Sequence, residues 1–75
     1  MEFEANTTYV LVRGTWLKAE IHLRRLLATE VEASQIAERR RHEVRLKNGA
    51  RIICMSVDKA YQGAGLLGYK KIVHL

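Results

Sequence analysis

The sequence predicts a small α/β domain in which one long or kinked helix packs against a sheet of three to four strands, in the order β-α-β-β-β. Three observations support this prediction: a short apolar run comes first, a stretch with helical periodicity follows, and an Asn-Gly pair then separates two strand-like runs. The chain has 75 residues, of which 48% are hydrophobic. We therefore expect residues 1–75 to form one domain.

The first strand is predicted at residues 9–12, Tyr-Val-Leu-Val. A short apolar run of β-branched and aromatic residues that ends near a glycine, here Gly14, is typical of a buried strand. The next strand-like run lies a whole helical segment later in the chain. A parallel pairing between the two strands is therefore allowed, because the intervening helix is long enough to cross over the sheet.

The helix is predicted to start after Thr15, a residue type that caps helix N-termini. Apolar residues recur at helical spacing from Trp16 to Val31. The segment 29–32, Thr-Glu-Val-Glu, has the form of a capping box, which marks the start of a helix. We therefore expect the helix to kink or restart there and to continue toward Arg41.

An Asn-Gly pair, Asn48 and Gly49, gives the clearest local signal. Both residues accept the positive φ angles of a type I′ turn, so residues 43–47 and 50–57 are predicted to form a β-hairpin. The first arm alternates polar and apolar residues, as a half-exposed strand does. The second arm is apolar on both faces, which favours a position in the middle of the sheet.

The C-terminal part is predicted to contain a loop or short helix at 58–68 and a last strand at 69–75. The glycines of 63–68 match the pattern of a dinucleotide-binding loop. Such a loop directly follows a strand and opens a helix, and this segment does neither. We therefore interpret the glycines as a turn and expect no cofactor.

The predicted strands 9–12 and 52–57 are apolar on both faces, whereas one helix covers only one face of a sheet. The second face must be covered by a partner protein, by a second copy of the chain, or by Tyr61, Leu66 and Leu67 folding back over it. We expect a protein-interaction surface formed by Leu66, Leu67 and Tyr69. It would lie at this face or at the exposed edge of the last strand.

The chain has a formal net charge of +5, which suits either simple solubility or attraction to phosphates. The candidate nucleic-acid contacts are Arg39, Arg40, Arg41, Arg45, Lys47 and Arg51. The alternative is a solvated basic face, because cations in the last turn of a helix also interact favourably with its dipole. No aromatic residue interleaves with these charges, so single-strand recognition is not indicated and any binding is expected to be non-specific.

Catalytic and metal-binding patterns are not predicted. His22, His42 and His74 have no nucleophile in their vicinity, and no pair of Cys or His residues has zinc-ligand spacing. Cys54 lies in the most apolar strand, where burial raises the pKa of a thiol. We expect a protein without catalytic residues, metal or cofactor.

The chain has a single cysteine, a start that is acidic rather than basic, and no apolar run near the ~20 residues of a membrane span. A lone thiol that cannot pair within the chain fits a reducing compartment. We therefore expect a cytoplasmic protein with no membrane segment.

The segment 44–53, with Ser56, Ala60, Gly63 and the strand 69–73, resembles part of the motor ATPase of phage terminase large subunits and related helicases. In those motors a strand, an Asn-Gly turn, a second strand and a glycine-containing loop lead into the Walker B strand. The run 9–12 and the helix after it are similar to the elements that precede this segment. The resemblance implies a motor-like α/β fold.

The sequence departs from these motors in two ways. It has no Walker A loop, and His74 and Leu75 stand where the paired acidic residues that hold magnesium would be. Without these groups a motor cannot hydrolyse ATP. The resemblance therefore implies a non-catalytic phage or mobile-element protein that keeps the shape of a motor fragment and binds another protein, or a second copy of itself. The alternative is a basic accessory protein that binds nucleic acid.

Overall fold

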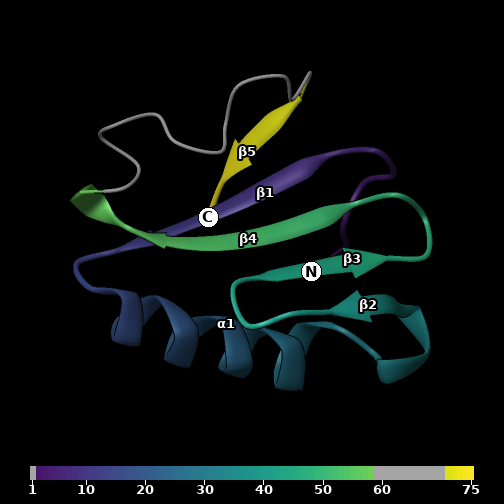
Figure 1. Cartoon of the computed structure of the whole chain (residues 1–75). Coiled ribbons are helices and arrows are strands. Elements are labelled where there is room, and N and C mark those ends of the chain that lie inside the picture. Colours follow the sequence, from purple (N-terminus) through teal and green to yellow (C-terminus); the bar gives the residue numbers. More distant parts are fainter. Residues whose placement is uncertain (1, 59–70) are drawn as a thin grey trace.

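The computed structural model describes residues 2–58 and 71–75, and in this part of the chain an α-helix packs against a five-stranded mixed sheet (Figure 1). The predicted α/β class and element order are confirmed, but the sheet has five strands rather than three to four. The elements are β1 (Thr8–Arg13), α1 (Trp16–Glu30), a 3-10 turn (Ala33–Gln35), β2 (Ile36–Arg39), β3 (Glu43–Leu46), β4 (Arg51–Ser56) and β5 (Ile72–His74).

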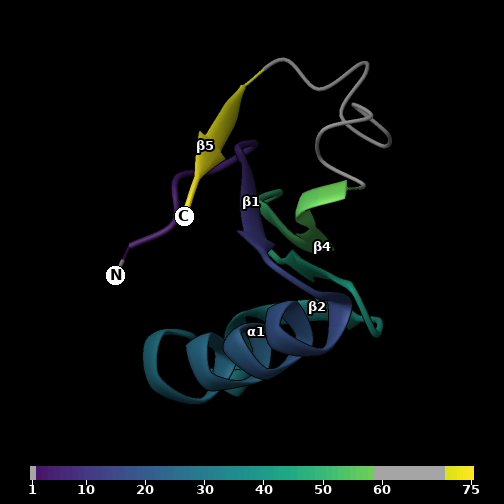
Figure 2. The same ribbon diagram turned by 90° about the vertical axis from the view of Figure 1, so that its left-hand side faces the viewer.

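The strands lie in the order β2-β3-β4-β1-β5. β1 pairs in parallel with β4 and with β5, whereas the β2–β3 and β3–β4 pairs are antiparallel. The parallel β1–β4 pair confirms the crossover that the long helical segment allows. Figure 2 shows α1 under one face of the sheet and β5 at the far edge, away from the helix.

The start of α1 is fixed by its N-cap. Thr15 has an extended backbone, and its hydroxyl accepts a hydrogen bond from the backbone N–H of Lys18 at 3.2 Å. This bond satisfies one of the N–H groups that have no partner within the first turn of a helix. The predicted start of the helix is therefore confirmed.

The predicted continuation of the helix toward Arg41 is wrong. α1 ends at Glu30. The capping box is not formed by residues 29–32 but by Glu32 and Gln35, at the start of the 3-10 turn. The Thr29 hydroxyl instead donates to a carbonyl within α1. Residues 36–39 then form β2, because pairing with β3 satisfies their backbone groups and packs Ile36 against the core.

The core lies between α1 and the sheet. Strand residues on this face alternate with residues on the other, and Val44 and Ile52 are 0% exposed. The residues of this cluster are Phe3, Tyr9, Leu11, Ala19, Leu23, Leu27, Val31, Val44, Leu46, Ala50, Ile52 and Cys54.

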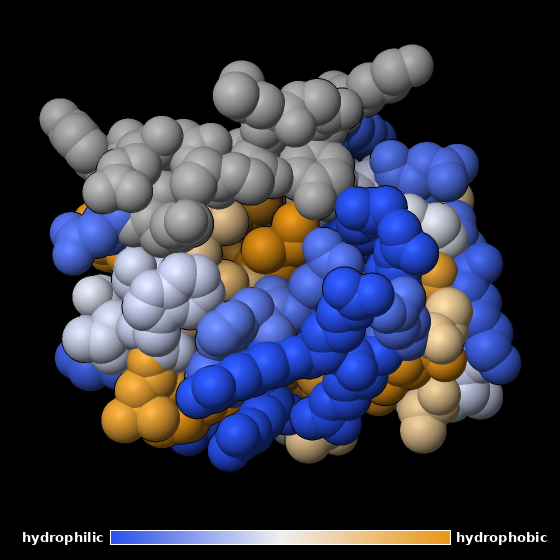
Figure 3. All heavy atoms as spheres, in the orientation of Figure 1, coloured by the Kyte–Doolittle hydropathy of each residue, from blue (hydrophilic) through white to orange (hydrophobic). Residues whose placement is uncertain are grey.

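On the sheet face opposite α1, Val10 and Met55 are also buried. Strand alternation places them there, because their neighbours Leu11 and Cys54 pack against the helix. Figure 3 shows an apolar area over this part of the sheet. The three residues predicted to fold back over this face, Tyr61, Leu66 and Leu67, lie outside the described residues.

The β3–β4 hairpin is confirmed, but its turn is not type I′. Gly49 has a φ of 91°, whereas Asn48 does not have a positive φ. Leu46 and Ala50 close the hairpin through a backbone hydrogen bond of 2.9 Å, which leaves a three-residue loop with Gly49 in the left-handed position. Asn48 serves another purpose, because its side chain accepts from the Ala50 N–H and donates to the Phe3 carbonyl.

We expect Gly49→Ala to lower the free energy of unfolding by about 1–3 kcal/mol. A residue with a Cβ would be strained at the positive φ of this position, and its Cβ would collide with the side chain of Asn6. Gly14→Ala is the matched control, because a Cβ there meets no atom within 4 Å. Urea unfolding of both variants measures the difference, and equal losses at the two glycines would contradict the prediction.

Candidate nucleic-acid interface

A groove of about 350 Å³ lies between α1 and the turn that joins β2 to β3. Four arginines line this arginine groove, together with two leucines of α1: Leu23, Arg24, Leu27, Arg39, Arg40 and Arg41. Arg39 ends β2 and is paired with Val44, whose side chain is in the core on the α1 side. The turn after β2 therefore brings three consecutive arginines next to Arg24 of α1.

Two of the four guanidinium groups are paired within the protein. Arg40 Nε donates to Glu38 Oε1 at 2.6 Å, and Arg41 Nε donates to Glu20 Oε1 at 2.6 Å. Among the residues that the structure describes, Arg24 and Arg39 have no carboxylate partner. The arginine groove therefore keeps positive charge that no side chain of the described protein neutralises.

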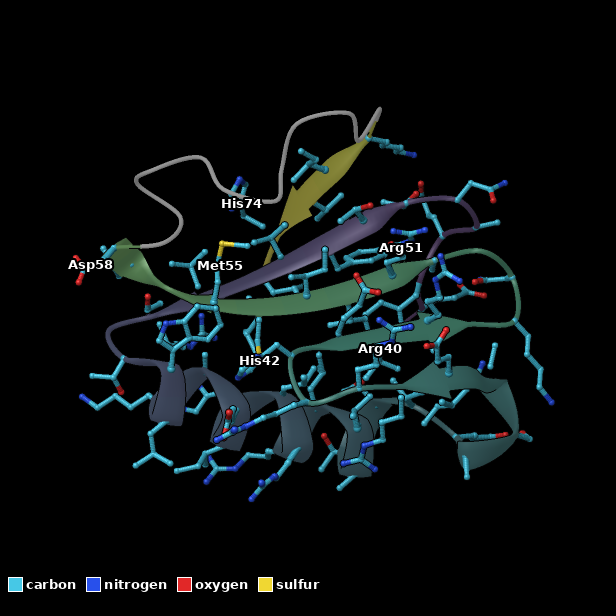
Figure 4. The ribbon with its side chains drawn as sticks, viewed as in Figure 1. Arg40, His42, Arg51, Met55, Asp58 and His74 are labelled. Atoms are coloured by element: carbon cyan, nitrogen blue, oxygen red, sulfur yellow. The ribbon has the colours of Figure 1, made fainter. Side chains whose placement is uncertain are left out.

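Glu20 attaches the β2–β3 turn to the helix. Its side chain is only 8% exposed, and Oε1 accepts hydrogen bonds from Arg41 Nε and from His42 Nε2, each at 2.6 Å. The hydrogen bond from His42, supported by Arg41, holds the pKa of Glu20 below its ordinary value against the opposing effect of its desolvation. Trp16, at the start of α1, packs on the His42 ring with a centroid distance of 4.5 Å. Figure 4 shows His42 between β4 and α1.

The environments of Cys54, His22 and His74 differ from one another. Burial, and next the negative charge of Glu20, raise the pKa of the Cys54 thiol to about 11, which confirms the prediction for this residue. His22 Nδ1 accepts a hydrogen bond from Arg13 Nε at 2.6 Å. His74 lies on β5 and is exposed.

The predicted hairpin cations are connected to the arginine groove through Glu38, whose carboxylate pairs with Arg40 and also with Arg45. Arg45 and Arg51 are paired across β3 and β4, and with Lys47 they line a shallow pocket of about 250 Å³. Strand alternation places Arg45 on the face opposite the core residues Val44 and Leu46. Glu38 approaches Arg45 at 3.7 Å and moderates the charge of this hairpin cluster. Figure 3 shows hydrophilic side chains gathered over this part of the sheet.

The structure therefore places the six predicted nucleic-acid contacts in two neighbouring groups, which Arg40 and Arg45 connect through Glu38. Arg39, Arg40 and Arg41 belong to the arginine groove and lie in a strand and a turn, so the alternative explanation through a helix dipole does not apply to them. The predicted protein-interaction residues Leu66, Leu67 and Tyr69 lie outside the described residues. The expected edge position of the last strand is confirmed for β5.

The sequence analysis did not identify three residues that lie next to the basic run 39–42: Glu20, Arg24 and Trp16. Glu20 and Trp16 are four residues apart on α1, a spacing that places both on one side of a helix. The sequence shows this spacing, but it does not show that Glu20 and Trp16 contact Arg41 and His42. Those contacts depend on β2 and the turn after it lying beside α1.

Comparisons of the chain with protein-family models, with curated proteins and with solved structures gave no match. The resemblance to motor ATPases stays a prediction. In residues 2–58 and 71–75 there is no group of three or more His, Cys, Asp or Glu side chains arranged to hold a metal ion. None of the helices described is long and apolar enough to cross a membrane.

The hydrogen bonds that the Glu20 carboxylate accepts predict a dependence of stability on pH. Because the folded protein lowers the pKa of this carboxyl below 4.5, the charged form stabilises the fold above that pH, and this contribution is lost as the pH falls through the lowered value. We expect Glu20→Gln to lower the melting temperature at pH ~7 and to reduce its decrease between about pH 5 and 3. Thermal unfolding followed by circular dichroism measures both effects.

Glu38→Gln is the control for this prediction. Glu38 also has a lowered pKa, caused mainly by its hydrogen bond from Arg40, but its side chain is 40% exposed and therefore better screened by water. The change in melting temperature should be smaller for Glu38→Gln than for Glu20→Gln. The opposite order would show that Glu20 does not anchor the turn.

Proposed function

We propose that this protein acts by binding rather than by catalysis, and that its ligand is the phosphate backbone of a nucleic acid. The observation that supports this function best is the arginine groove, where Arg24 of α1 and Arg39 of β2 line one hollow and have no carboxylate partner among residues 2–58 and 71–75. A guanidinium group presents several N–H donors in a plane and matches the oxygens of a phosphate.

The charge of the whole chain supports the same ligand. A net charge of +5 attracts a polyanion over a distance and raises the rate of encounter. The hairpin cluster of Arg45, Lys47 and Arg51 offers a second region for phosphate contacts. Because phosphates carry no sequence information, this interface is proposed to hold nucleic acid without selecting its sequence.

A protein-interaction module is the second candidate. It is favoured by the edge position of β5, a three-residue strand that pairs with β1 on one side. Edge strands present backbone groups to which a partner strand can add. In this proposal, the protein is a phage or mobile-element fragment of a motor domain, and Leu66, Leu67 and Tyr69 contribute to docking.

A salt titration separates the two functions. We expect a labelled duplex of about 20 base pairs to bind at low salt, and the logarithm of its association constant to fall linearly with the logarithm of salt concentration. Two to four phosphate contacts predict a slope of about −2 to −4. Absence of DNA binding at ~50 mM salt, together with salt-resistant self-association in sedimentation, would favour the protein-interaction module instead.

A further inference from the structure

We propose that the nucleic acid bound by this protein is single-stranded, and that an unpaired base stacks on the Trp16–His42 ring pair beside the arginine groove. This inference rests on the proposed function, because the arginines supply the phosphate contacts whether the nucleic acid is a single strand or a duplex. It adds a stacking site that separates single strands from duplexes.

Trp16 is suited to this role because it is a large aromatic residue that is partly exposed to solvent. The residue is 39% exposed although it is the largest side chain type in the chain. Its ring contacts His42 at an interplanar angle of 48°, so the two rings form a tilted pair rather than a closed stack. A half-exposed indole is the kind of platform on which bases stack in proteins that bind single strands.

The aromatic pair and the cations are held in place by the same carboxylate. Glu20 accepts hydrogen bonds from both His42 and Arg41, so the imidazole next to Trp16 and the guanidinium group of Arg41 lie side by side. Glu20 is buried, so the carboxylate that connects these two side chains is shielded from water, whereas the Arg41 side chain is 77% exposed and accessible to a ligand. The site therefore has a stacking surface adjacent to a phosphate-binding charge.

The length of the region fits a short strand. Trp16 and Arg24 are separated by two turns of α1, about 12 Å at the rise of an α-helix. A stacked strand advances about 3.4 Å per nucleotide, so the span corresponds to roughly three to four nucleotides. Arg39, Arg40 and Arg41 lie along the same groove beside α1 and are placed to contact the phosphates of such a strand.

A duplex cannot readily place a base on the Trp16–His42 ring pair. Its bases are already stacked on each other and paired, so an aromatic ring on the protein surface reaches one only after the duplex opens locally. The arginines by themselves would accept either form. Preference for single strands is therefore the property that depends on Trp16 rather than on charge.

The test uses the intrinsic fluorescence of the full chain, in which Trp16 is the one tryptophan. The probes are an oligodeoxythymidine of about 12 nucleotides, a duplex of equal length and inorganic polyphosphate. We expect the single strand to quench Trp16 emission and to bind more tightly than the duplex. Polyphosphate should bind without comparable quenching, because it has no base.

Variants at Trp16 give a second readout, with binding followed by the anisotropy of a labelled oligonucleotide. Trp16→Leu should weaken single-strand binding roughly 5- to 150-fold and leave duplex binding nearly unchanged, whereas Trp16→Phe should retain most of the preference. Leu17→Ala, at the exposed neighbouring position, is the matched control. Circular dichroism confirms that each variant is folded.

The possible outcomes distinguish the two proposals. If all three polyanions bind with similar affinity and without quenching by the single strand, the stacking site is wrong and the phosphate-binding function stands. If none binds at low salt, both are wrong. A loss of single-strand and duplex binding by the same factor in a folded Trp16→Leu variant would also overturn the stacking site, because it would show a structural role.

Discussion

Replacing Ile52 by alanine is expected to lower the free energy of unfolding by about 2–5 kcal/mol, which is a large part of the stability of a small domain. Ile52 is 0% exposed in β4 and is paired with Tyr9 of β1 and Val44 of β3. Its side chain therefore joins the parallel and antiparallel halves of the sheet under α1. Urea unfolding at equilibrium measures the loss.

Ile53→Ala is the matched control for this substitution. Ile53 is the next residue of the same strand, but it points to the face opposite α1 and is only partly buried. The loss of stability should be clearly smaller there. Equal losses at the two positions would mean that the sheet face against α1 is not the dominant core of the protein.

Removing the two groove arginines Arg24 and Arg39, by Arg24→Ala with Arg39→Ala, is expected to weaken nucleic-acid binding on the order of 10²-fold at low salt. Each lost phosphate contact should also reduce the salt slope by about one. Stability should change little, because neither residue makes an ion pair in the part of the chain that the structure describes. Anisotropy titrations at several salt concentrations measure the affinity and the slope.

The control is the pair Lys18→Ala with Arg25→Ala, which removes the same net charge from α1. Lys18 lines none of the grooves described above, and Arg25 lines a different pocket, beside His22 and Leu26. If binding depended only on net charge, both double variants would lose the same affinity. That result would contradict a defined site at the arginine groove.

Local sequence patterns were sufficient for most of the fold. The strand at 9–12, the Thr15 cap and the β3–β4 hairpin were predicted correctly, because each depends on residues close together in the chain. The turn type was wrong. The Asn48 side chain bonds to Phe3, which is 45 residues away and cannot be foreseen from an Asn-Gly pair.

The largest error concerns residues 36–39, which were predicted to be helical and form β2. Charged residues such as Glu38 and Arg39 are compatible with either structure when considered alone. Their pairing with β3 decides the outcome, since it satisfies the backbone and buries Ile36. This error also hid the arginine groove, because only a strand beside α1 brings Arg39 next to Arg24.

The sequence by itself determined the fold class, the positive charge and the burial of Cys54, since hydrophobic periodicity, composition and turn residues act locally along the chain. Only the tertiary structure decided which charges meet. It left Arg24 and Arg39 without a carboxylate partner in the described part of the chain, attached Arg41 to Glu20 and placed Trp16 on His42. The physical reason is that a side chain's partner depends on the packing of distant elements, which no local pattern specifies.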